Sequence, residues 1–232
     1  MHEKIVFDIE TVGFNWNVFS EEEQEYLLNR ADIPQDERDQ IKKKETETMK
    51  HLSFYALTAQ IVAISMFNPD TNKGKVFYIN PQMEEFSEED EALKFVPYEK
   101  EEDVLKQFWS LIVNYRQFIT FNGSGFDCPF ILLRSALLGI KPTRNLMTYK
   151  YSHEHHCDLM SQLTFYGATK PFSLDFYCRR FGIVSPKASG ISGKDVGNLF
   201  KEGKYTKIAK YCMEDTKATA KLYFKWQEFL KF

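Results

Sequence analysis

The chain has 232 residues, 43% of them hydrophobic and 27% charged, with a net charge of −3. This size and composition predict a folded chain that buries roughly 70 to 75% of its unfolded surface, and they exclude a disordered tail, a disulfide-stapled mini-protein and a globally basic nucleic-acid-binding protein. No segment approaches the about 18 to 20 apolar residues of a membrane span, and the start MHEKIVFDIE has acids where a signal peptide has a basic and then an apolar run, so we expect a soluble cytoplasmic protein without membrane contact.

The opening residues 4–10, KIVFDIE, predict a buried central strand that delivers two acids near its C-terminal end. Asp8 and Glu10 are two residues apart, so their side chains point the same way. An insertion follows at about residues 14–58. Its dense mixed charge and sparse apolar residues predict one or two exposed helices, which could shape the entrance to a site or bind a protein partner.

Residues 60–80 predict a β-hairpin. The β-branched runs QIVAISMF and GKVFYIN flank a turn rich in Asn, Pro, Asp and Gly, and with the first strand they form one sheet. Residues 81–103 carry ten acids against two lysines. We therefore expect a solvated connection there.

Residues 101–140 predict a helix, a strand and a second helix. Apolar side chains at 104, 105, 108, 109, 112 and 113 form a helical stripe, and QFITFNG reads as a short parallel strand ending in a turn. The segment DCPFILLRSALLGI, which begins with Asp127, has Pro129 near its first turn and ends at Gly139, as a helix capped at both ends does.

Beyond residue 145 the chain is predicted to be mainly helical, with short segments at 158–165, 173–181 and 194–202. A long amphipathic helix at about 205–230 ends the chain and places Tyr211 and Asp215 on one face. This order of elements predicts an α/β fold with a mixed sheet flanked by helices and right-handed crossovers.

Four carboxylates stand out by position: Asp8, Glu10, Asp127 and Asp215. Acids at strand and loop ends, without cysteine or histidine spacing beside them, predict a hard oxygen-ligand site for Mg²⁺ or Mn²⁺ rather than a zinc site. Two divalent ions would cancel the four charges, and paired metals are suited to phosphodiester hydrolysis. Taken singly, each acid is explained as well by a sheet end or a helix neighbour, so the prediction depends on the joint pattern.

Three segments carry a resemblance to a known family: FDIET at 7–11, FNGSGFDCPF at 121–130 and YCMED at 211–215. They resemble the exonuclease motifs of the DEDD, or DnaQ-like, 3′-5′ exonucleases, and the tyrosine before the last aspartate marks the DEDDy branch. The second motif is similar to the exonuclease domain of family B DNA polymerases and to stand-alone predicted exonucleases that resemble it. The resemblance covers most of the chain and implies one exonuclease domain over residues 1–232, with an RNase H-like mixed five-stranded sheet.

The resemblance also implies roles for individual residues. Two divalent cations, Mg²⁺ or Mn²⁺, would be held by Asp8, Glu10, Asp127 and Asp215, with Asp8 bridging both. Tyr211 would orient the attacking water together with Glu10; a tyrosine pKa near 10 makes it a positioning group rather than a base at neutral pH. Thr11, Asn122 and Phe126 are expected to contact the terminal sugar and base, although Phe126 could instead pack the helix against the sheet.

The leading hypothesis is a metal-dependent 3′-5′ exonuclease that acts on single-stranded or frayed DNA ends and releases nucleoside 5′-monophosphates by a two-metal mechanism. An exoribonuclease on the same fold is the nearest alternative, because nothing in the motifs reads the 2′-hydroxyl. Two further alternatives are a non-catalytic nucleic-acid-binding or partner-recruiting module, and an interaction protein that works through residues 14–58.

Charge and histidine patterns add weaker predictions. Residues 1–127 contain 13 Lys and Arg against 25 Asp and Glu, whereas residues 128–232 contain 17 against 8, so the second half is the candidate polyanion-facing surface. Lys187 and Lys194 flank the Gly-rich SGISGK loop, which is expected to follow the nucleic-acid backbone. The cluster at His153, His155 and His156 lacks a second ligand group for zinc, and Asp158 beside it is expected to cap a helix.

Overall fold

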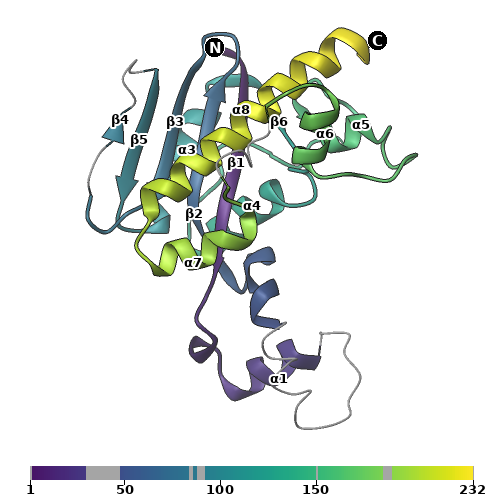
Figure 1. The fold of residues 1–232 in the computed structure, drawn as a ribbon. Coiled ribbons are helices and arrows are strands. Elements are labelled where there is room, and N and C mark those ends of the chain that lie inside the picture. Colours follow the sequence, from purple (N-terminus) through teal and green to yellow (C-terminus); the bar gives the residue numbers. More distant parts are fainter. Residues whose placement is uncertain are drawn as a thin grey trace.

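The computed structural model describes residues 2–29, 48–83, 86–87, 92–149, 151–184 and 190–231. Within these residues one mixed sheet contains seven strands in the order β4-β5-β3-β2-β1-β6-β7 (Figure 1). The strands are β1 (His2–Gly13), β2 (Ala59–Asn68), β3 (Lys73–Ile79), β4 (Phe86–Ser87), β5 (Leu93–Tyr98), β6 (Tyr115–Thr120) and β7 (His156–Asp158). Because β1 pairs with β2 on one side and β6 on the other, it lies inside the sheet, as predicted for residues 4–10.

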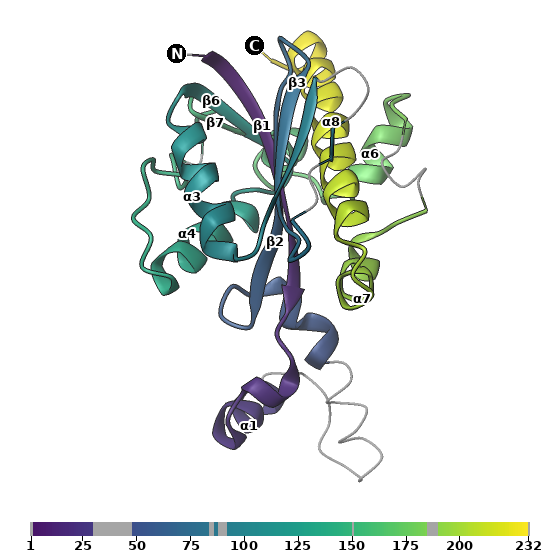
Figure 2. The ribbon, with the colours of Figure 1, turned by 90° about the vertical axis from the view of Figure 1, so that its left-hand side faces the viewer.

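Helices cover both faces of the sheet (Figure 2). One face carries α3 (Glu101–Ile112) and α4 (Asp127–Leu137), and the other carries α6 (Leu174–Arg180), α7 (Val196–Lys201) and α8 (Tyr205–Phe229). The short α5 (Leu159–Leu163) follows β7. The predicted α/β fold is thus confirmed, and none of the described helices is both long and apolar enough to cross a membrane.

Alternation along β1 separates the core from the candidate site. Phe7 is 1% exposed and its ring lies edge-on to Phe108 of α3, with 5.2 Å between the ring centroids. The next side chain, Asp8, lies instead beside Cys212 of α8. Because successive side chains of a strand point to opposite faces, Asp8 and Glu10 both face the α8 layer.

The sheet is larger than the five strands expected, because residues 81–103 are not only a solvated connection. They contain β5, in which Leu93 and Phe95 are buried and Lys94 is exposed. Phe95 pairs with Val76 of β3 in a parallel ladder. The acids on both sides mask this short alternating pattern in the sequence. The three-residue β7 was also missed; it pairs with β6 and is too short to produce a periodic pattern.

The ends of the helices follow local sequence signals. The helix α3 begins at Glu101, three residues before its first predicted apolar position, and its first turn holds three acids that interact favourably with the helix dipole. The helix α4 ends before Gly139, whose φ of 69° lets the N–H of Ile140 bond to Ser135 and that of Gly139 to Ala136. This is the predicted glycine end of the helix.

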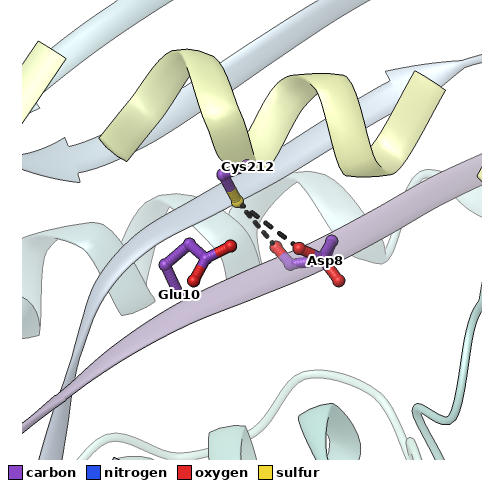
Figure 3. Close-up of side chains that lie close together, drawn as sticks. All are labelled: Asp8, Glu10 and Cys212. Atoms are coloured by element: carbon purple, nitrogen blue, oxygen red, sulfur yellow. Dashed lines mark hydrogen bonds between the residues drawn. The ribbon is translucent and has the colours of Figure 1, made fainter. Parts of the chain in front are cut away.

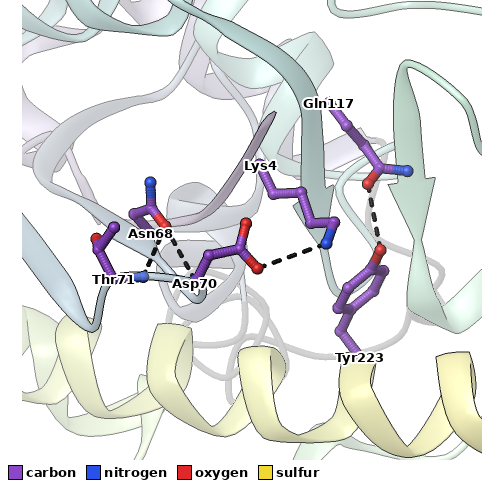
Figure 4. Close-up of polar contacts among 6 residues, drawn as sticks. All are labelled: Lys4, Asn68, Asp70, Thr71, Gln117 and Tyr223. Carbon is purple, nitrogen blue, oxygen red and sulfur yellow. Dashed lines mark hydrogen bonds and ion pairs between the residues drawn. The ribbon is translucent and has the colours of Figure 1, made fainter. Parts of the chain in front are cut away.

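At the end of the sheet where β1 begins, polar contacts join neighbouring elements (Figure 4). In the β2-β3 turn, the Asn68 side chain accepts a hydrogen bond of 3.0 Å from the N–H of Asp70, and Asp70 lies 3.5 Å from the ammonium of Lys4. The Tyr223 hydroxyl of α8 donates to Gln117 of β6 over 3.2 Å. The hairpin turn is therefore attached to β1, and α8 is attached to β6.

The predicted insertion leaves the sheet after β1. Its described part contains a 3-10 helix (Trp16–Val18), the helix α1 (Glu21–Asn29), a helical turn at 48–51 and a second 3-10 helix (Leu52–Phe54). None of the α1 residues is buried, and α1 projects away from the sheet in Figures 1 and 2. Residues 30–47 of the insertion lie outside the described residues.

Candidate active site

The structure brings the two acids of β1 against α8. One ligand atom each from Asp8, Glu10 and Cys212 lie within 4.8 Å of one another (Figure 3). The Cys212 thiol points toward β1 and lies 3.5 Å from the Asp8 carbonyl oxygen and 3.8 Å from its Oδ2. The sequence motifs gave this cysteine no role; its position directly after Tyr211 is the signal that could have placed it beside the acids.

Asp127 reaches the same place from the start of α4. It is 3% exposed, and its Oδ1 accepts a hydrogen bond of 3.1 Å from the N–H of Ile9, the residue between Asp8 and Glu10. The first residue of α4 is thereby fixed to the backbone of β1. A contact over 118 positions joins the first and second motifs.

Asp215 and Tyr211 come from α8, one turn apart. The Tyr211 side chain is 5% exposed and hydrogen-bonds to the carboxylate of Asp215. Asp215 lies close enough to raise the pKa values of Asp8, Glu10 and Asp127. All four predicted acids and the tyrosine are thus together.

Burial and mutual repulsion raise the pKa values of these carboxyl groups. Burial raises the pKa of Asp8 most, followed by the charges of Asp127, Asp215 and Glu10, while the Cys212 hydrogen bond lowers it. The pKa of Glu10 is likewise raised by burial and then by Asp215 and Asp127. Burial raises the pKa of Asp127 to about 7, against hydrogen bonds from backbone N–H groups that lower it. The metal-free cluster therefore holds protons at pH values where ordinary carboxyl groups are ionised.

The donor set fits hard divalent cations. Four carboxylates supply oxygen ligands, and cations placed among them would remove the repulsion that raises their pKa values. Without metal, the Cys212 sulfur is a neutral thiol, because burial, then Asp8 and Glu10, raise its pKa well above its usual value.

Tyr211 stays protonated in this environment. Burial is the largest cause of its raised pKa, and Asp215, Glu10 and Asp8 raise it further. A phenol in this state donates a hydrogen bond and cannot remove a proton from water. The geometry therefore agrees with a positioning group rather than a base.

The loop that leads to Asp127 is held by Asp158, for which the sequence favoured a helix cap. Asp158 is 5% exposed and does cap α5, accepting a hydrogen bond of 3.0 Å from the N–H of Met160. Its two carboxylate oxygens also accept hydrogen bonds of 2.9 Å from the N–H groups of Asn122 and Ser124. Asp158 thus positions the second motif from β7.

Glycine is required in this loop. A Cβ atom on Gly123 would lie within 2.5 Å of the Cβ of Thr120, closer than side-chain atoms approach, while Asn122 has a positive φ of 66°. Both features follow from the sharp turn between β6 and α4. They explain the Asn-Gly pair of the second motif.

The expected substrate contacts differ in how accessible they are. The Thr11 hydroxyl already donates to the carbonyl of Ser53 over 2.7 Å, so it joins β1 to the insertion. Phe126 is partly buried against the core, with its ring 5.4 Å from that of Phe130. Lys194 is exposed in the 3-10 helix Gly193–Asp195. Lys187 lies outside the described residues, and substrate contacts by these side chains and Asn122 stay predictions.

The histidine cluster does not converge. His156 is buried, stacks on Phe118 with centroids 4.3 Å apart, and hydrogen-bonds to the Thr120 hydroxyl over 2.8 Å. His153 lies edge-on to Trp226. Burial lowers the pKa of His156 to about 4, so it is neutral at physiological pH. These residues support the sheet and α8, in line with the weak zinc signal in the sequence.

Comparison with known proteins agrees with this geometry. Residues 54–231 match a family model described as a predicted 3′-5′ exonuclease related to the exonuclease domain of PolB. The match begins at residue 54, near the end of the insertion, so β1 with Asp8 and Glu10 lies outside it. No curated protein matches the chain.

Among solved structures, the chain is similar to the family B DNA polymerase from the hyperthermophilic archaeon Pyrobaculum calidifontis, with a TM-score of 0.59 and 16% sequence identity. The match covers 98% of this chain, including β1, and 25% of the polymerase chain. The chain therefore spans a quarter of the length of that polymerase. At this identity the likeness shows the fold alone.

Proposed function

Because the chain belongs to the family of predicted 3′-5′ exonucleases related to the exonuclease domain of PolB, we propose that it hydrolyses the terminal phosphodiester of single-stranded or frayed DNA. The observation that carries the proposal is the convergence of three separated segments on one acidic cluster, in which Glu10 and Asp127 are buried and Asp8 and Asp215 are half-buried. Asp127 bonds to β1 between Asp8 and Glu10, and Asp215 faces them from α8. Unneutralised acids destabilise a fold, so a scaffold would gain nothing from them.

In the proposed reaction, water attacks the terminal phosphorus, the bond to the 3′ oxygen of the preceding nucleotide breaks, and a nucleoside 5′-monophosphate leaves. Two divalent cations, Mg²⁺ or Mn²⁺, held by Asp8, Glu10, Asp127 and Asp215, supply charge neutralisation and a lower pKa for water. Glu10 and the protonated Tyr211 orient the water. Asn122 and Phe126 contact the terminal nucleotide, and Lys194 follows the backbone. The exonuclease domain extends over residues 1–232, with residues 14–58 as a partner-binding or entrance-shaping insertion.

The test uses 5′-labelled single-stranded DNA and RNA of one sequence, incubated with Mg²⁺, with Mn²⁺ or with chelator. We expect a ladder that shortens from the 3′ end with either metal and is absent in chelator. Asp8→Asn and Asp215→Asn should lose at least about 100-fold in rate, because each removes a metal ligand, and Tyr211→Phe should keep a reduced but measurable rate. Faster shortening of RNA would reassign the substrate.

Asp103→Asn is the matched control, because the Asp103 side chain is 44% exposed on α3 and lies outside the cluster. It should shorten DNA at the wild-type rate. Wild-type turnover by folded Asp8→Asn or Asp215→Asn protein, or shortening that persists in chelator, would refute the assignment of the site. No shortening of either strand by the wild-type protein would favour the non-catalytic binding module.

A further inference from the structure

Two exposed phenylalanines stack on each other at the start of α6. Phe172 is 53% exposed and Phe176 is 46% exposed. Their ring centroids lie 4.7 Å apart with an interplanar angle of 25°. Large apolar rings gathered at the surface leave apolar area in water, and such patches mark binding sites more often than isolated exposed side chains do.

Ring contacts connect this pair with the candidate active site. Phe172 lies edge-on to Tyr177 at 6.1 Å, and Tyr177 lies edge-on to Phe121 at 5.9 Å. Phe121 directly precedes Asn122, where the loop to Asp127 begins. The exposed pair is therefore two ring contacts away from the second motif.

The buried side of α6 faces the same site. α6 packs beside α8 in Figure 1, and Cys178 of α6 is buried. Burial raises the pKa of the Cys178 thiol to about 12, and the nearby Asp215 carboxylate is the next largest cause. One side of α6 thus approaches a proposed metal ligand, while Phe172 and Phe176 remain exposed to solvent.

The charges around the pair are mainly positive. Lys170, Arg179 and Arg180 are exposed, and the nearby acid, Asp175, pairs with Arg179 over 3.1 Å. Exposed aromatic rings beside basic side chains are the combination that binds single-stranded nucleic acid, since rings stack on bases and cations attract phosphates. Charge complementarity thus favours a single strand as the occupant.

We propose that Phe172 and Phe176 form a stacking platform for bases of the single strand upstream of the cleaved nucleotide, with Lys170 and Arg180 beside its phosphates. The platform deepens the proposed function and rests on it. Stacking does not discriminate between bases, so the platform would bind strands of any sequence. A substrate too short to reach it would gain nothing from it.

The experiment compares wild-type protein with the Phe172→Ala/Phe176→Ala variant on two substrates, a 12-nucleotide oligothymidylate and thymidine 5′-(4-nitrophenyl) phosphate. The second contains one nucleotide and reports on the chemical site alone. We expect the ratio of kcat/KM for the oligomer to kcat/KM for the ester to fall about 5- to 100-fold in the variant. Phe224→Ala, which removes a ring of similar exposure from α8, should keep the wild-type ratio.

An unchanged ratio in the double variant, or an equal fall in Phe224→Ala, would overturn the platform. Failure of the proposed function is distinguishable, because the wild-type protein would then hydrolyse neither substrate. In that case fluorescence anisotropy of the labelled 12-mer in chelator still tests the platform. Weaker binding by the double variant supports it, and equal binding refutes it and leaves the surface for a protein partner.

Discussion

The carboxyl group of Asp127 illustrates the electrostatic cost of the site. Burial, Asp158 and Asp215 raise its pKa to about 7, whereas an unfolded aspartate has a pKa near 3.9. Between these two values the folded state binds more protons than the unfolded state. The free energy of unfolding of the metal-free protein therefore decreases as pH rises toward and through 7.

We expect the Tm of the protein in chelator to fall between pH 6.5 and 8, and Mg²⁺ or Mn²⁺ to restore it at pH 8. His156 has the opposite effect on stability and mainly at lower pH. Because its pKa is lower in the folded state, the free energy of unfolding decreases as pH falls from about 6.5 toward 4. Asp127→Asn should show a shallower fall, since one titrating carboxyl is gone, and the exposed Asp103→Asn should keep the wild-type slope. Calorimetry at several pH values measures this; an equally steep fall in Asp127→Asn would contradict the raised pKa.

At the scale of elements, the turn from β6 into α4 is the part of the site most dependent on its surroundings. The Asp158 carboxylate, delivered by β7, joins this turn to the start of α5 by hydrogen bonds to Asn122, Ser124 and Met160. Residues that orient metal ligands typically contribute 10- to 100-fold in metal affinity or activity. Loss of these hydrogen bonds should therefore lower metal affinity or activity while the helices stay folded.

Asp158→Ser separates the two roles of this side chain. Serine is a good helix cap but is too short to reach both N–H groups of the turn, so the fold should persist while kcat falls about 10- to 100-fold and more Mg²⁺ is needed for half-maximal rate. Asp158→Asn, which keeps one oxygen acceptor, should lie between it and the wild type. Rates measured across a Mg²⁺ titration, with Tm in parallel, test this.

Ser20→Ala is the control for loss of a cap, because Ser20 accepts from the N–H of Glu23 at the start of α1. It should leave the Mg²⁺ dependence unchanged. If Asp158→Ser kept the wild-type rate and the wild-type Mg²⁺ dependence, Asp158 would be a helix cap alone.

At the scale of the molecule, one buried ion pair joins segments far apart in the chain. Arg134 of α4 donates from Nε to Glu101 of α3 over 2.9 Å, and the same Glu101 oxygen accepts from the N–H of Ile61 in β2. The guanidinium also donates to the carbonyl of Ala56 and lies over the ring of Phe14, 5.2 Å from its centroid. Phe14 and Ala56, near the two ends of the insertion, are thus both attached to α4.

We expect Arg134→Met to lower the free energy of unfolding by about 3 to 5 kcal/mol, because it leaves Glu101 charged, buried and without its cation. The double variant Arg134→Met/Glu101→Gln should lose less. Lys106→Met, which breaks the exposed pair with Asp103, should cost less than about 1 kcal/mol. Urea unfolding measures the stability of all three variants. A double variant less stable than Arg134→Met would contradict the explanation that the loss comes from the unpaired charge of Glu101.

Strong local periodicity made much of the fold predictable. The apolar run of β1, the hairpin turn at Asn68 and the stripes of α3 and α8 appear in the sequence because each element needs one continuous buried face. Elements that are very short, or whose pattern is hidden by neighbouring charged residues, could not be recognised in the sequence. β5 lies among acids, and β7 has three residues, so both depend on a neighbouring strand rather than on their own pattern.

The sequence by itself determined which acids to consider, because two-residue spacing on a strand and four-residue spacing on a helix fix common faces for Asp8 with Glu10 and for Tyr211 with Asp215. Only the tertiary structure decided that Asp127 bonds to β1, that Cys212 lies beside Asp8 and that Asp158 holds the turn. These contacts join residues 34 to 204 positions apart. Local spacing carries no information about them, since they arise from how strands pair and helices pack.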